Sequence, residues 1–321
     1  MVDINVWITS LTDQIKQIDL KALGLQLVKF IKKNKSLTFG LMIFVPIVFM
    51  AVFADFLAPY PYDQINDNCG EEYPSCSYAP PSPQHLFGTN ILGRDVLSRI
   101  MYGAQVSLLM AFSAVILALI VGVPLGILSG YFGGPIDRAL TMAADTIYSF
   151  PSLLLAIMLS IALTQFADLK VIIGVAVATA IVYIPVYFRI VRSQVLQVKE
   201  ESYIEAAKSM GARHATILFR YVLPNVISAP IAMIAFNMTE AILTNAGLAF
   251  LGLGIQPPTA DWGYDVYKHR SLSQVRRYPW LIFFPALFIF LLSFSLSLIG
   301  DALNDKFNPL IGRTALEIEG K

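Results

Sequence analysis

Four polar side chains within an otherwise apolar stretch are the first candidates for chemistry in this 321-residue sequence. They comprise three uncharged polar groups and one carboxyl: Asn237, Glu240, Thr244 and Asn245. An ionisable side chain inside a membrane span is costly and by default faces a wet cavity or a partner. We therefore expect these four residues to line a translocation path, with Glu240 foremost. The alternative for Glu240 is an interhelical hydrogen bond made in the protonated form.

Motifs for catalysis are missing from the sequence. It contains no GxxxxGK[ST] phosphate loop, no HExxH zinc motif and no GxSxG nucleophile motif. A formal net charge of +1 shows no overall excess of basic residues of the kind that binds nucleic acid. We expect no catalytic residue, no metal and no cofactor bound by this chain, so that it is not an enzyme. Energy for any work must come from a partner or an ion gradient.

A charged segment from Arg189 to Pro224, between two apolar runs, is the second candidate. Ser202 followed three residues later by Glu205 is a capping box and predicts a short helix from that point. Gly211 then interrupts the helix. Such a short, capped and charged helical loop between two apolar runs is suited to binding a soluble partner.

The composition requires a membrane for these segments. The chain is 56% hydrophobic and 14% charged, whereas soluble domains carry about 25% charged residues. Six apolar spans approach the ~20 residues needed to cross a bilayer: about 37–57, 104–129, 139–163, 171–191, 224–254 and 279–300. Each holds an interior proline, which predicts bent helices around an internal path. The predicted fold class is an all-α membrane protein with six transmembrane helices.

Most of the 23 lysine and arginine residues fall on one side of this arrangement, which predicts cytoplasmic N- and C-termini in a multi-pass cell-membrane protein. The basic stretch from Lys268 to Arg277 runs against the rule. Residues 1–35 read as a basic amphipathic helix on the inner leaflet, or as a loosely ordered tail.

The charged segment resembles the EAA loop of permease subunits in binding-protein-dependent ABC importers. The resemblance lies in the spacing of Glu205, Ala206, Ala207, Gly211 and the block ending in Leu223-Pro224. It implies a coupling loop, 193–223, that docks in a partner ATPase, and a type I importer permease bundle. The expected coupling residues are Ser202, Glu205, Ala206, Ala207, Gly211 and Arg213.

Further blocks resemble the C-type subunit of dipeptide, oligopeptide and nickel permeases. They include HLFGTN and LGRD at 85–95, LAFLGLGIQPPT at 248–259 and the terminal run from Gly300 to Pro309. The resemblance implies an outer rim for a solute-binding protein, with Arg94, Asp95 and Trp262 as candidate docking residues. We also expect Arg94 to pair with Asp95, and Arg138 with Asp145.

The resemblance further implies a set of partners. These are a second homologous permease subunit, two ATP-binding subunits that hold ATP and magnesium, an extracytoplasmic solute-binding protein and the lipid bilayer. The expected organisation is an N-terminal segment (1–35), a first transmembrane helix with a long outer loop (36–103), the permease domain (104–312) and a tail (313–321).

The only two cysteines, Cys69 and Cys76, lie in the long outer loop. On the oxidising side of a membrane they would close a small disulfide loop, with free thiols as the alternative.

The predicted function is therefore import of di- or oligopeptides, driven by ATP hydrolysed on partner subunits. The same machinery importing oligosaccharides or nickel is one alternative. An ion-coupled secondary transporter or channel that uses Glu240 is another, although no internal repeat supports it.

Overall fold

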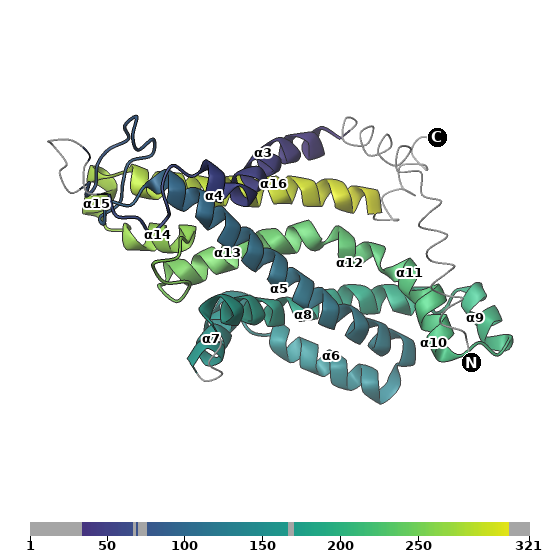
Figure 1. Ribbon diagram of the computed structural model, residues 1–321. Coiled ribbons are helices and arrows are strands. Elements are labelled where there is room, and N and C mark those ends of the chain that lie inside the picture. The colour runs from purple at the N-terminus through teal and green to yellow at the C-terminus, as the bar shows by residue number, and fades with distance from the viewer. Residues whose placement is uncertain (1–33, 67–68, 70–75, 166–169, 308–321) are drawn as a thin grey trace.

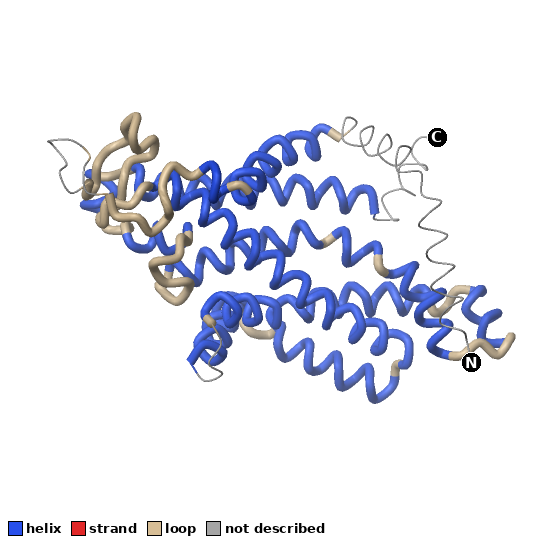
Figure 2. The backbone as a smooth tube through the Cα atoms, in the orientation of Figure 1, coloured by secondary structure: helices blue, strands red, loops and turns tan. Residues whose placement is uncertain are grey.

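The computed structural model describes residues 34–66, 69, 76–165 and 170–307, so the predictions for 1–33 and for the C-terminal tail lie outside the described residues. Helices dominate the described part (Figures 1 and 2). Their bounds are α3 Lys35–Val52, α4 Ala54–Leu57, α5 Val96–Phe132, α6 Gly134–Tyr148, α7 Ser152–Gln165, α8 Val171–Val198, α9 Ser202–Ser209, α10 His214–Ile217, the π-helix η1 Leu218–Val222, α11 Leu223–Val226, α12 Ser228–Ala232, α13 Ile234–Phe250, α14 Trp262–Lys268, α15 Leu272–Arg277 and α16 Trp280–Phe307.

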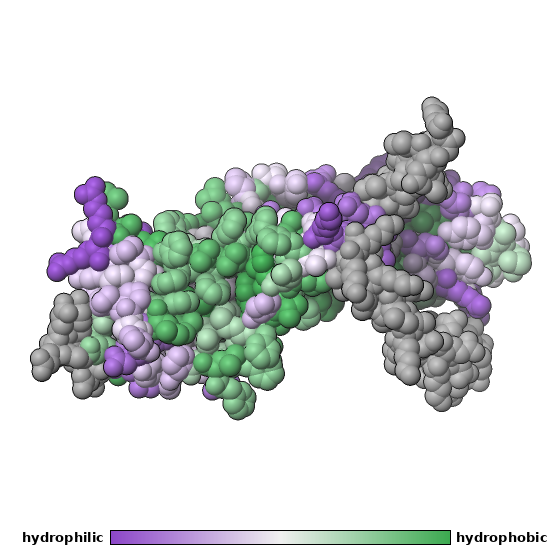
Figure 3. All heavy atoms as spheres, turned by 90° about the horizontal axis from the view of Figure 1, so that it is seen from above, coloured by the Kyte–Doolittle hydropathy of each residue, from purple (hydrophilic) through white to green (hydrophobic). Residues whose placement is uncertain are grey.

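Several of these helices are built for a bilayer. Five helical stretches are long and apolar enough to cross one: Lys35–Val52, Val96–Phe132, Val171–Val198, His214–Ala232 and Trp280–Lys306. The bent pair α6 and α7 supplies a sixth if it is counted as one span. On the face seen in Figure 3, hydrophobic side chains cover the middle of the molecule and hydrophilic ones gather towards both ends. The predicted helical membrane fold is confirmed.

The predicted third span, 139–163, is not one continuous helix. α6 and α7 meet at an angle of 96° across residues 149–151. Pro151 has no N–H to continue the ladder and disfavours helical geometry at Phe150, so the chain turns there. Pro124 and Pro185, by contrast, are accommodated inside α5 and α8.

The predicted fifth span, 224–254, is also made of pieces. After the π-helical turn η1, the chain forms α11, α12 and then α13. Pro224 and Pro230 lie within the first two of these short helices, and the long regular helix begins only at Ile234.

The most extensive helix contact in the described part is that of α5 with α8, which run side by side through the bundle (Figure 1). Three glycines one helical turn apart, Gly122, Gly126 and Gly130, let the backbones approach. A Cβ at Gly126 would lie 2.7 Å from the carbonyl oxygen of Phe188, and one at Gly130 would lie 2.8 Å from the Cβ of Val195. The pair therefore has no room for a methyl group.

Substitution of Gly126 should reveal this contact. Gly126→Ala is expected to lower the stability of the purified protein by about 1–3 kcal/mol, because the neighbouring backbone must move. Gly247→Ala is the matched control, since its Cβ would meet only the flexible end of Leu153 at 3.3 Å. That change should be neutral or mildly stabilising. Thermal unfolding in detergent measures both, and equal midpoints would contradict the assignment.

Candidate functional site

The loop that joins α8 to α10 forms one end of the molecule (Figure 1). α9 begins at Ser202 as expected, but the predicted capping box is wrong: the N-cap is Glu201, and no side chain caps the helix. Gly211 has a φ of +77°, which glycine adopts at little cost, and its N–H donates to the carbonyl of Lys208 as the chain leaves the helix.

The α9 loop divides into an anchoring face and an exposed face. Ile204 and Ala207 are buried and pack in one apolar cluster with Val191 and Val195 of α8. Ser202, Glu205, Ala206, Gly211 and Arg213 are exposed. The structure thus brings together five of the six expected coupling residues on the surface and uses Ala207 to hold the helix in place.

Apolar side chains add to this exposed face. Met210 is 80% exposed and Tyr203 is 40% exposed. Apolar and charged groups mixed on a small, anchored surface suit a protein–protein contact. Sequence reasoning missed these two residues, because only the folded loop shows that they lie outside the apolar cluster.

Two ion pairs tie α8 to α6 near this end. Arg192 makes a two-pronged contact with Asp137, at 2.6 and 2.8 Å, and Arg189 lies 2.7 Å from Asp145. The expected pairing of Arg138 with Asp145 is therefore wrong. The arginines of α8 reach these carboxylates because α6 folds back against α8.

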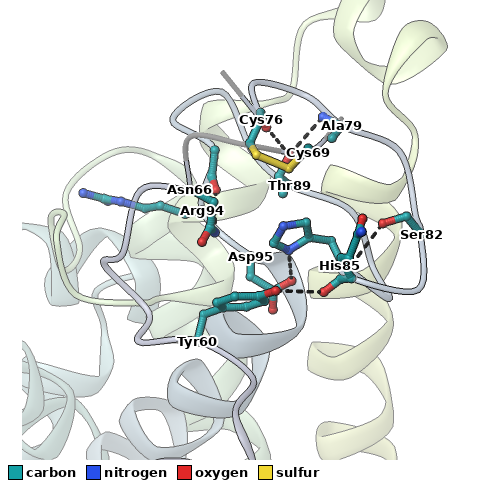
Figure 4. Close-up of a disulfide and its surroundings, with 12 residues drawn as sticks. Tyr60, Asn66, Cys69, Cys76, Ala79, Ser82, His85, Thr89, Arg94 and Asp95 are labelled. Carbon is teal, nitrogen blue, oxygen red and sulfur yellow. Dashed lines mark hydrogen bonds and ion pairs between the residues drawn. A yellow bond between two sulfur atoms is a disulfide. The ribbon is translucent and has the colours of Figure 1, made fainter. Parts of the chain in front are cut away.

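The opposite end is a cap formed by residues 76–95 together with α14 and α15 (Figure 2). Cys69 and Cys76 are joined by a disulfide in this cap. Asp95 is the N-cap of α5, where its carboxylate accepts a hydrogen bond from the Ser98 N–H at 2.7 Å. Its other oxygen lies 2.9 Å from Nδ1 of His85 (Figure 4).

The expected pairing of Arg94 with Asp95 is therefore wrong. The capping role turns the carboxylate of Asp95 inward, where it is 1% exposed. The Arg94 side chain points away from it (Figure 4), and its buried Nε has no hydrogen-bond partner in the described part of the chain.

Trp262 is buried in the cap instead of facing solvent. It is 1% exposed, lies over Gly103 and donates a hydrogen bond from Nε1 to the carbonyl of Ile100 at 3.0 Å. One turn further along α14, Asp265 holds Arg99 through a 2.8 Å ion pair that is also buried. These contacts anchor α14 to the start of α5, so Trp262 positions the cap and presents almost no surface to a partner.

Asp261 begins α14 as its N-cap and accepts a hydrogen bond from the Tyr264 N–H at 2.7 Å. Burial raises the pKa of Asp261 from 3.8 to about 7, a shift that the Tyr264 N–H and Arg99 oppose and the charge of Asp265 reinforces. The cap therefore contains a carboxyl group that is protonated at mildly acidic pH.

This pKa predicts a pH-dependent stability. Between about pH 4 and pH 7 the unfolded chain has lost the Asp261 proton while the folded protein retains it, so the contribution of Asp261 falls as pH rises. The slope approaches about 1.4 kcal/mol per pH unit and vanishes above the folded pKa. Asp261→Asn should remove this slope. Thermal unfolding at pH 5, 6, 7 and 8 compares the two proteins, and parallel curves would contradict the raised pKa.

The four polar residues of the fifth span separate into two pairs. Thr244 lies 3.2 Å from the hydroxyl of Tyr183, and Asn245 accepts a hydrogen bond from Thr179 at 2.9 Å, so both lie between α13 and α8. Asn237 and Glu240 instead border a cavity of about 370 Å³ between α6, α8 and α13. The structure thus places Asn237 and Glu240 beside this cavity, while Thr244 and Asn245 are hydrogen-bonded to α8.

A multi-helix membrane bundle with a cavity that Asn237 and Glu240 border, and with an exposed polar loop at one end, is consistent with a membrane transport subunit. The chain belongs to the family of binding-protein-dependent transport system inner membrane components, whose family model matches residues 122–312. A second model, the N-terminal transmembrane domain of oligopeptide transport permease C, matches residues 26–81.

Curated relatives agree with this assignment. The chain is 38% identical over 281 residues to the dipeptide transport system permease protein DppC of Alkalihalophilus pseudofirmus, covering 88% of both chains. It is 35% identical over 278 residues to the oligopeptide transport system permease protein OppC of Bacillus subtilis, covering 87% of both. It is 36% identical over 289 residues to the glutathione transport system permease protein GsiD of Escherichia coli O157:H7, covering 88% of this chain and 89% of the relative.

A solved structure shares the fold. The MetNI methionine ABC transporter in inward-facing conformations aligns with a TM-score of 0.50 at 17% identity, over 64% of this chain and 96% of its own. The protein is thus a multi-pass inner-membrane permease subunit of a binding-protein-dependent ABC importer.

Proposed function

We propose that this subunit imports di- and oligopeptides. The observation that carries the proposal is its 35–38% identity, over 87–88% of the chain, to permeases named for dipeptides, oligopeptides and glutathione. All three names describe substrates with peptide bonds. Membership of the family disfavours the ion-coupled transporter or channel, while oligosaccharides and nickel become outcomes of the test.

The proposed assembly has four kinds of component. A second homologous permease subunit completes the path, two ATP-binding subunits hydrolyse ATP with magnesium, and a solute-binding protein delivers the peptide from outside. The α9 loop faces the cytoplasm and the cap faces outwards. Support for this orientation comes from the excess of lysine and arginine on the α9 side and from the disulfide in the cap.

The exposed face of α9 is the proposed contact with the ATP-binding subunits. Its residues are anchored through Ile204 and Ala207 to α8, so a push on α9 acts on a long membrane helix. This link would allow closure of the ATP-binding subunits to rock the bundle.

Reconstitution tests the substrate class. The complete complex in proteoliposomes, with its binding protein outside, should take up labelled dialanine only when hydrolysable ATP is inside. Parallel assays offer labelled maltotriose and nickel ions. Preferential uptake of either, or uptake of dialanine without ATP, would contradict the proposal.

The coupling role of α9 has a test of its own. Glu205→Lys should lower ATP-dependent uptake more than tenfold, because it reverses a charge on the exposed face, and leave membrane insertion unchanged. Gly211→Trp should act in the same direction, since its left-handed backbone disfavours any side chain.

Glu200→Lys is the matched control, an exposed charge reversal just before the helix. Uptake, and co-purification of the ATP-binding subunits, measure the effect. Normal uptake by Glu205→Lys and Gly211→Trp would remove α9 from the coupling path.

A further inference from the structure

The cavity between α6, α8 and α13 has a carboxylate with no countercharge. Glu240 is exposed on α13 and has no basic group within 4.0 Å in the described residues. Glu240 lies in the middle part of α13. That helix runs between the end of the molecule with the α9 loop and the end with the cap (Figure 1). A carboxylate at membrane depth does not face lipid, so this surface of α13 faces water or a cationic partner.

The two arginines of α8 that follow the cavity are already engaged. Arg189 lies one turn along α8 from Val186, which borders the cavity. Its guanidinium contacts Asp145 at 2.7 Å and stacks 4.0 Å over the ring of Tyr148. Arg192, a turn further, is held by Asp137. Among the described residues that border the cavity, Glu240 is the charged one.

Other features of the cavity also favour a cation. α6 ends at Tyr148 and α7 begins at Ser152, and both residues border the cavity, so the opposite partial charges of these two helix ends offset one another and leave the Glu240 carboxylate as the main local charge. Phe150, in the break between α6 and α7, is 49% exposed and borders the same space, and an aromatic face attracts cations. The remaining walls are largely apolar and include Ile147, Val182 and Val186.

Asn237, one turn before Glu240, supplies a second polar group. It borders the cavity, and its buried amide lies beside the hydroxyl of Tyr187, although Nδ2 makes no hydrogen bond of normal geometry within the described residues. A rotation of the amide towards the cavity would give this donor an acceptor such as a peptide carbonyl. A volume of about 370 Å³ is near the lower end of ligand sites, which span ~300–1,000 Å³.

We propose that this cavity is a subsite for the amino terminus of the transported peptide. The carboxylate of Glu240 pairs with the ammonium group, the amide of Asn237 contacts the first peptide group, and the apolar walls hold the first side chain. The inference rests on the proposed peptide import and deepens it. It assigns the ammonium, in preference to the carboxylate, as the end of the peptide that this subunit recognises.

Direct binding to the nucleotide-free complex, without binding protein, tests the subsite. The probes are dialanine and N-acetyl-dialanine at millimolar concentration, measured by calorimetry on the complete permease–ATPase complex. Dialanine is expected to bind at least tenfold more tightly, because acetylation removes the positive charge. Equal binding of the two probes, or no binding of dialanine, would overturn the subsite.

Variants at Glu240 sharpen the test. Glu240→Gln should weaken dialanine binding at least tenfold, Glu240→Asp should retain a preference for dialanine over its acetylated form, and the exposed control Glu200→Gln should match the wild type. Unchanged binding by Glu240→Gln overturns the proposal. If Glu240→Gln fails to assemble, Glu240 pairs with a basic side chain of a partner subunit. The comparison of dialanine with N-acetyl-dialanine on the wild-type complex then decides whether the subsite exists.

The uptake assay separates this inference from the proposed function. ATP-driven dialanine uptake by the wild type, together with equal binding of both probes, leaves peptide import standing and removes the subsite. Absence of dialanine uptake removes both.

Discussion

An unpaired polar group is costly in hydrocarbon. This cost determines where the chain can carry polar side chains or interrupt a helix. The pairs Arg192–Asp137 and Arg99–Asp265 link different helices, and each satisfies two charges at once. Thr179 and Asn245 do the same with uncharged groups between α8 and α13. Against this background of paired groups, the exposed carboxylate of Glu240 is informative, because nothing in the described chain satisfies it.

Close packing of α5 on α8 is the frame on which the two ends are built. α5 has 37 residues and is therefore about 55 Å long, which exceeds the ~30 Å hydrocarbon core. Its first turn carries the cap through Asp95 and Arg99, and near its last turn Tyr131 contacts His214 of α10 at 2.8 Å. One helix thus touches both ends of the molecule.

Sequence reasoning recovered what depends on local pattern. The apolar spans, the start of α9 at Ser202 and the interruption near Gly211 all follow from residue types within a few positions. The bend in the third span was within reach, since Phe150-Pro151 marks it, but all six predicted spans contain a proline and only the structure shows which of them break. Composition does not tell whether neighbouring helices can support a kink.

Pairing between distant residues was beyond the sequence. Asp145 pairs with Arg189, 44 positions away, and not with Arg138. Asp95 pairs with His85 and not with the adjacent Arg94. In both cases the course of the backbone determines the partner, because α6 folds back on α8 and the N-cap geometry of α5 turns the carboxylate of Asp95 inward. The burial of Trp262 likewise depends on Gly103, which lies 159 positions earlier and leaves space for the indole.

The arrangement of fixed and adjustable parts bears on how such a subunit can move. α5 and α8 meet without space for a methyl group, so they move as one body, and the α9 loop is anchored to that body through Ile204 and Ala207. α13 is different, because the π-helical turn, α11 and α12 divide the chain between it and the loop. Short segments joined at Ile227 and Met233 can change their angles at less cost than a continuous helix, whose hydrogen bonds would have to break. A displacement of the loop therefore reaches α8 directly. It reaches α13 both through these joints and through the packing of α13 on α5 and its hydrogen bonds to α8. Because the cavity lies between α8 and α13, its shape depends on how far these contacts make the two helices move together.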